Sequence, residues 1–114
     1  MVSMALFGLM AWADSQAPII NIGSMARTIE QVGFNTFWLW DTPLYTKDPY
    51  VGLTLAALNT NKLLLGPGVS NALTRHKSVL VNSIATLDDI SNGRTILGFG
   101  RGAPGSANVL GFPT

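Results

Sequence analysis

The chain has 114 residues, and its seven Lys and Arg residues against six Asp and Glu residues give a formal net charge of +1, which excludes the strong positive field that attracts nucleic acid or an anionic membrane. Charged residues make up 11% and hydrophobic residues 47%, against about 25% charged in an ordinary soluble domain, so we expect an apolar face to be buried against another chain. Because the chain has no cysteine and no apolar run near the roughly 18 residues of a membrane span, we expect neither disulfides nor a membrane segment, and we predict a cytoplasmic protein.

Residues 4–10 are predicted to form the first strand. The apolar run MALFGLMAW also fits a secretory signal, but a signal needs a positively charged leader and the first basic residue is Arg27. We therefore favour a strand. A helix is predicted over 18–32, because proline suits the first helical turn and Gly33 suits a left-handed C-cap.

Residues 35–40 and 62–65 are predicted to form the second and third strands. Between them, Asp48-Pro49 supplies a capping acid followed by a proline, which predicts a helix that runs to about Leu58. The third strand leads into Gly66-Pro67-Gly68, where regular strand pairing must bend or break.

A third helix is predicted over 77–90, where apolar residues recur along one face. It ends at Ser91-Asn92-Gly93, a cluster typical of a C-cap and turn. A fourth strand over 94–99 follows, and then a short helical turn near 107–110.

Three apolar runs, FWLW, LLLG and TILGFG, fill both faces of their predicted strands. A strand that is apolar on both faces must be covered on both, which is typical of a parallel α/β sheet with right-handed crossovers. In such proteins the chemistry lies at the carboxyl ends of the strands. The loops that follow these runs are therefore the predicted location of the site.

Two longer stretches, residues 29–76 and 84–102, contain GPGVSN, TRH, ATLDDISNGR and GFGRG in this order. They resemble the amino-terminal part of the luciferase-like monooxygenase superfamily, with most similarity to its deazaflavin-dependent, methylenetetrahydromethanopterin reductase-like branch. The resemblance implies a single domain, 1–114, that forms the N-terminal half of a TIM (β/α)8 barrel with about four parallel strands and three helices. A complete barrel takes about 250 residues.

The resemblance also implies a flavin- or deazaflavin-dependent oxidoreductase or monooxygenase that transfers hydride through FMN or coenzyme F-420. Its substrate and electron acceptor stay open, as does the activity of this chain by itself. The alternative is a non-catalytic half-barrel scaffold from a truncated gene, which self-associates. We assign no catalytic residue and no metal site.

Asp41 and Thr42 follow the second strand, where members of the superfamily use an acid to frame the cofactor ring. A histidine often follows that acid, but here Thr42 does, which donates a hydrogen bond and does not titrate near neutral pH. The alternative for Asp41 is an Asx-turn into Pro43. The superfamily's glutamate in the first strand is matched here by Met10, so two common acid and base groups are absent.

The segment Gly68-Val69-Ser70-Asn71 is the main candidate for cofactor binding. Glycine lets the backbone approach a flat ring closely, Val69 offers an apolar face, and Ser70 and Asn71 offer polar groups to the ring edge. The resemblance implies a non-proline cis peptide bond at Gly68-Val69. The alternative is an ordinary turn that closes a strand.

Gly100 and Arg101 belong to the stretch GFGRGA, which matches a G-x-G-x-x-G/A pattern. A dinucleotide site would also need a helix, a strand and an acid about 20 residues later, so we interpret the stretch as a loop at the mouth of the pocket with Arg101 as an anion contact. Arg75 and His76 precede the third helix, and we interpret them as a solvated arginine and a capping or packing histidine rather than an anion site.

Trp12, Trp38 and Trp40 are interpreted as core or barrel filling, because alternate strand positions favour burial. Four strands with helices on one side leave the inner face and two edges bare, and such surfaces favour association. We therefore expect a homo-oligomer, most simply a two-fold dimer.

Overall fold

Three strands form one parallel sheet in the computed structural model, which describes residues 4–112. They are β1 (Gly8–Ala11), β2 (Thr36–Leu39) and β3 (Leu64–Pro67), in the order β1-β2-β3. Both pairings are parallel, so the three carboxyl ends share one edge and the predicted parallel α/β class is confirmed. The ends of the predicted domain, residues 1–3 and 113–114, lie outside the described residues.

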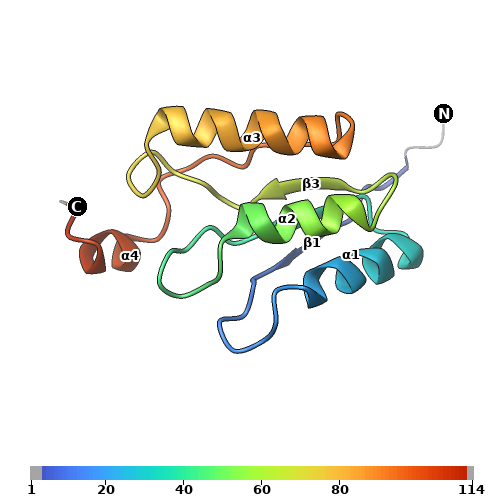
Figure 1. The fold of residues 1–114 in the computed structure, drawn as a ribbon, viewed down its shortest axis with the longest axis horizontal. Helices are drawn as coiled ribbons and strands as arrows, with labels where there is room; N and C mark the ends of the chain where they lie inside the picture. The colour runs from blue at the N-terminus through green and yellow to red at the C-terminus, as the bar shows by residue number, and fades with distance from the viewer. Residues whose placement is uncertain (1–3, 113–114) are drawn as a thin grey trace.

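Three helices pack side by side on one face of this sheet (Figure 1). They are α1 (Asn21–Val32), α2 (Pro49–Leu58) and α3 (Lys77–Ser91). Their ends follow the predicted capping chemistry: the Asp48 side chain accepts hydrogen bonds at the start of α2, and Gly33 and Asn92 adopt positive φ angles of 105° and 59° after α1 and α3. None of the helices within residues 4–112 combines the length and the hydropathy that a membrane crossing requires.

The core lies between the helices and the sheet. Phe37, Leu39 and Leu65 are 0% exposed and pack against residues of all three helices. The opposite face of the sheet carries no helix (Figure 1). Met10 on that face is 54% exposed, and Trp38 lies beside positions where only glycine leaves room.

The first strand is shorter than the predicted range 4–10. The Phe7 backbone N–H donates to the Asn35 side chain at 2.9 Å instead of to a neighbouring strand, so regular pairing starts at Gly8. The first helix likewise starts at Asn21, three residues after the predicted start, because residues 18–20 form a turn in which the Pro18 carbonyl accepts from Asn21 at 3.1 Å.

The predicted fourth strand over 94–99 does not form a continuous strand. It makes two isolated parallel bridges, Leu65 with Thr95 and Ser70 with Phe99. The ladder begins, because the Ile96 N–H donates to the Leu65 carbonyl at 2.9 Å. The next bond would need an N–H on Pro67, which proline does not have, so the pairing stops there and resumes at Ser70.

A fourth helix, α4 (Pro104–Val109), lies near the end of the described chain (Figure 1). The helical turn was predicted near 107–110, and the helix starts three residues earlier. Pro104 occupies its first turn, a position where a missing backbone N–H is not costly.

Candidate functional site

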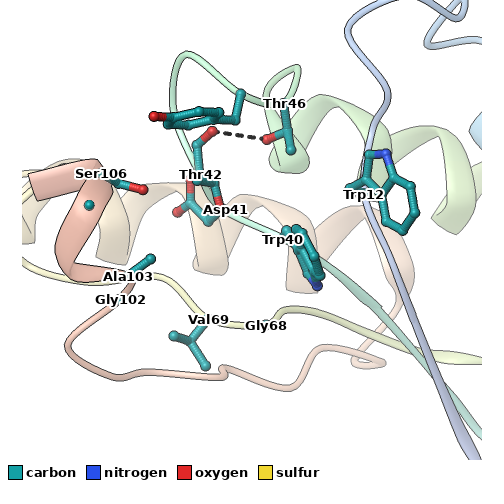
Figure 2. Close-up of a pocket in the computed structure, with 12 residues that line it drawn as sticks. Trp12, Trp40, Asp41, Thr42, Thr46, Gly68, Val69, Gly102, Ala103 and Ser106 are labelled. Atoms are coloured by element: carbon teal, nitrogen blue, oxygen red, sulfur yellow. Dashed lines mark hydrogen bonds between the residues drawn. The ribbon is translucent and has the colours of Figure 1, made fainter. Parts of the chain in front are cut away.

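An open pocket of about 780 Å³ lies at the carboxyl edge of the sheet (Figure 2). It is built by the segments that follow β1, β2 and β3 and by the start of α4. Its lining residues are Trp12, Trp40, Asp41, Thr42, Tyr45, Thr46, Gly68, Val69, Gly102, Ala103, Gly105 and Ser106. The pocket therefore lies where the parallel sheet predicts chemistry, and it joins loops that are far apart in the sequence.

The pocket floor, which we define as Gly68 and Val69, follows β3. The peptide bond between these two residues is cis, as the resemblance implied. A Cβ atom on Gly68 would lie 2.9 Å from the Met10 methyl carbon and 3.2 Å from Cβ of Trp38, so glycine suits this close packing. Val69 is 37% exposed and presents its side chain to the pocket (Figure 2). The floor is thus apolar and shaped by backbone.

Asp41 is one of the lining residues, but its carboxylate is out of contact with solvent. The residue is 5% exposed, and its side chain is 0% exposed. The Ser70 hydroxyl donates to Oδ2 of Asp41 at 2.5 Å, and Nε and Nη2 of Arg75 donate to its two oxygens at 2.8 and 3.2 Å. Every donor that a buried carboxylate needs is therefore supplied by the chain itself.

Arg75 is not the solvated arginine that the sequence analysis predicted. Its side chain is 15% exposed, its Nη2 also donates to Asp48 at 3.2 Å, and its guanidinium carbon lies 4.7 Å from the centroid of the Tyr50 ring. Burial lowers the pKa of Arg75, but hydrogen bonds and attraction from Asp41 and Asp48 outweigh burial, so the pKa lies above its ordinary value. The guanidinium is fixed in its charged form.

Tyr50 completes this buried group. Its hydroxyl lies 2.8 Å from Oγ of Ser70. Because the Ser70 proton is donated to Asp41, Tyr50 must be the donor in the second bond. Burial raises the pKa of Tyr50, the charge of Asp41 adds to this, and Ser70 and Arg75 oppose it; the net result is a raised pKa. The hydroxyl therefore keeps its proton at neutral pH.

The predicted cofactor-binding residues lie in different places. Asp41, Thr42, Gly68 and Val69 line the pocket. Ser70, at 0% exposure, lies behind the floor.

Asn71, Gly100 and Arg101 also lie outside the lining. The buried Asn71 accepts hydrogen bonds from the backbone of Leu73 and Thr74 at 3.0 and 2.9 Å, so it shapes the loop. A Cβ on Gly100 would lie 3.3 Å from a methyl of Val69, so Gly100 supports the floor. Arg101 is exposed.

His76 caps the start of α3, which is one of the two roles, capping or packing, that were predicted for it. Its Nδ1 accepts from the Ser78 backbone N–H at 3.3 Å and lies 2.7 Å from the Ser78 hydroxyl.

Trp12 and Trp40 are not buried, in contrast to the interpretation of the three tryptophans as core or barrel filling. They are 52% and 42% exposed, both line the pocket, and their ring centroids lie 5.4 Å apart. Each is the first residue after its strand on the face opposite the helices, and this position is the sequence feature that identifies them. Tyr45, Thr46 and the start of α4 were also missed, because their place at the pocket depends on how the loops fold.

Comparisons with known proteins agree on one family. A family model described as luciferase-like monooxygenase matches residues 1–111. The 5,10-methylenetetrahydromethanopterin reductase of Methanolobus tindarius is 39% identical over 95 residues, which cover 83% of this chain and 29% of that protein.

Solved structures give the same fold. The coenzyme F-420 dependent tetrahydromethanopterin reductase of Methanopyrus kandleri matches with a TM-score of 0.89 and 35% identity, over 97% of this chain and 31% of that one. The oxygenating constituent of 3,6-diketocamphane monooxygenase from Pseudomonas putida, solved with FMN, matches with a TM-score of 0.78 and 21% identity, over 93% and 32%. This chain thus spans about a third of the length of the proteins it matches.

Proposed function

Because this chain belongs to the luciferase-like monooxygenase family, we propose that its pocket binds the flat ring of a flavin or deazaflavin, as part of an oxidoreductase that transfers hydride. One observation carries the proposal. The loop after β2 and the Gly68-Val69 floor after β3 meet at one pocket, on the carboxyl edge of a parallel sheet. That edge is where barrels of this type place their chemistry.

The residues present suit a flat, mostly apolar ring with a polar edge. The volume of about 780 Å³ falls within the usual range of ligand pockets, about 300–1,000 Å³. Val69 and Trp40 offer apolar surface, and Thr42 and Thr46 bring hydroxyl groups to the other side (Figure 2). Gly68 leaves the floor free of a projecting side chain.

FMN or coenzyme F-420, when bound, supplies the hydride chemistry. The chain's own residues bind the cofactor ring and orient it. Val69 and Trp40 exclude water from the apolar faces of the ligand, and Thr42 offers a hydrogen bond. Asp41 holds the loop after β2 in place, because its carboxylate is fully engaged with Ser70 and Arg75. The similarity to the two tetrahydromethanopterin reductases favours the deazaflavin over FMN.

A spectroscopic titration tests the proposal. Purified protein at tens of micromolar is mixed with FMN or with coenzyme F-420, and the visible absorption band of each is recorded. A perturbed band that saturates with protein supports a competent pocket. Unchanged bands for both ligands contradict the proposal for this chain.

A self-associating scaffold without catalysis is the second candidate. It is favoured by the uncovered sheet face, on which Met10 is 54% exposed. Oligomers that form with no change in either ligand spectrum would support the scaffold over the oxidoreductase.

A further inference from the structure

One arginine side chain joins the two loops that build the pocket. Arg75 lies in the segment after β3, and it contacts Asp41 and Asp48, which flank the loop after β2. The contact with Asp41 uses both carboxylate oxygens, at 2.8 and 3.2 Å. Two parallel bonds from a planar guanidinium fix the orientation of both partners, which a single bond does not.

The same carboxylate is connected to the pocket floor. Ser70 directly follows Val69, and its hydroxyl donates to Oδ2 of Asp41, the oxygen that also accepts from Nε of Arg75. The Ser70 backbone N–H donates to the Gly98 carbonyl at 2.9 Å. The residue that follows Val69 is therefore held by a buried ion pair, because Ser70 donates to the Asp41 carboxylate that Arg75 also binds.

We expect this group to lose its stability without Arg75. Asp41 would be left as a buried carboxylate with the Ser70 hydroxyl as its side-chain donor, and an unpaired buried charge is strongly unfavourable. Asp48 would lose its contact with the cation, although its other oxygen still accepts from Tyr50 N–H at 2.8 Å at the start of α2. The expected response is that Asp41 moves toward water and releases Ser70.

We infer that Arg75 is the positioning residue of the pocket floor: it holds Asp41, and through Asp41 and Ser70 it holds Val69 in the orientation that a ligand meets. The inference rests on the proposed function for its link to ligand binding. Arg75 itself does not line the pocket, so its effect on a ligand is indirect.

The test compares three variants. Arg75→Met removes the charge, Arg75→Lys keeps the charge but loses the two-pronged contact, and Arg27→Met is the matched control. Arg27 lies on α1 and donates to the Asn59 side chain at 2.5 Å, away from the pocket. If Arg75→Met does not fold, Arg75→Lys carries the same comparison.

Amide hydrogen exchange, followed by mass spectrometry, is the first measurement. In Arg75→Met, exchange of residues 66–74 should become faster by about tenfold or more, and in Arg75→Lys the increase should be smaller. In both variants, residues 36–39 should exchange as slowly as they do in the Arg27→Met control. An equal increase in both segments, or none in 66–74, overturns the inference, because Arg75 would then act on global stability or not at all.

The second measurement is the affinity for coenzyme F-420, or for FMN if FMN is the ligand whose spectrum the wild-type chain perturbs. Arg75→Met should weaken binding by about tenfold, and Arg27→Met should leave it unchanged. Faster exchange in 66–74 with unchanged affinity overturns the positioning role while the proposed function stands. If the wild-type chain leaves the FMN and coenzyme F-420 spectra unchanged, the proposed function fails, and the exchange measurement alone decides whether Arg75 holds the floor.

Discussion

Val69 is the side chain through which the pocket floor meets a ligand. It is 37% exposed and rests on Gly100, where a Cβ would come within 3.3 Å of its methyl group. A charge at this position would have to lose its water when a flat ring covers it.

We predict that Val69→Asp weakens the binding of FMN or coenzyme F-420 by about tenfold or more, which corresponds to about 1.4 kcal/mol. Fluorescence or absorption titration measures this. Val81→Asp is the control, because Val81 is 67% exposed on α3 and outside the pocket. Equal affinities for the two variants would show that the ligand does not contact the floor.

Arg94 is a second arginine with a structural role, at the opposite edge of the sheet. Its Nη2 donates to the Ala57 and Thr60 carbonyls at 2.9 and 3.1 Å, and its Nη1 donates to the Leu63 carbonyl at 2.9 Å. It therefore supplies donors to one carbonyl in the last turn of α2 and to two carbonyls in the loop that leads to β3.

We predict that Arg94→Met lowers the free energy of unfolding by about 2–4 kcal/mol, because several partly buried carbonyls lose their donor at once. Chemical denaturation measures the change. Arg27→Met, at an exposed contact, should change it by only about 0.5 kcal/mol. A similar loss in both variants would mean that the carbonyls find other donors.

At the scale of elements, Glu30 connects α1 to the start of β3. Its carboxylate accepts from the backbone N–H groups of Asn61, Lys62 and Leu63 at distances from 2.7 to 3.1 Å. Burial raises the pKa of Glu30, but these three bonds and the charge of Arg94 outweigh it, so the pKa lies below its ordinary value of 4.5.

A lowered pKa in the folded state means that ionised Glu30 stabilises the fold above pH 4.5, and that this contribution is lost as the pH falls through the lower, folded-state pKa. We predict that Tm falls less steeply in Glu30→Gln than in wild type over this range. Thermal unfolding followed by circular dichroism measures it, with Asp89→Asn, an exposed position on α3, as control. Parallel Tm curves for wild type and Glu30→Gln would contradict the prediction.

The elements show where sequence patterns were sufficient. Asp48-Pro49 and Gly33 located helix ends, because capping depends on neighbours in the chain. The stretch over 94–99 has strand composition, but its pairing depends on Pro67 of another segment, which has no N–H to offer. Pro104 lies in the first turn of α4 as Pro49 does in the first turn of α2, so the same proline signal is present at both helix starts.

The site was predictable in part for the same reason. Parallel strands bring their carboxyl ends together, so Asp41 and the Gly68 segment could be placed at one pocket. The pairing of Asp41 with Arg75 could not be predicted, because Arg75 lies 34 residues away and the contact depends on how two loops fold. Trp12 and Trp40 were interpreted as core or barrel filling from their alternate strand positions, and these positions do not reveal that both side chains lie on the uncovered face of the sheet.

At the scale of the whole molecule, the uncovered face of the sheet is the main feature. Met10, Trp12 and Trp40 are 54%, 52% and 42% exposed there. Burial of apolar surface contributes about 25 cal/mol per Å², so we expect a second copy that covers this face to be stabilised by it.

We predict that the chain forms a dimer or larger oligomer at micromolar concentration, and that Met10→Glu shifts it toward monomer. Light scattering coupled to size exclusion measures the mass. Val81→Glu, which places the same charge on α3 at a residue that is 67% exposed, should leave the oligomer intact. A monodisperse wild-type monomer would refute the prediction.

The carboxylate of Glu30 and the guanidinium of Arg94 both act at the amino edge of the sheet, while the bonded group of Asp41, Ser70 and Arg75 acts at the other edge. The proposed ligand pocket and the stabilising group of Glu30 and Arg94 therefore lie at separate edges of the sheet. Because the two groups share no residue, we expect substitutions that raise stability at the amino edge to combine additively with substitutions of exposed pocket residues at the carboxyl edge.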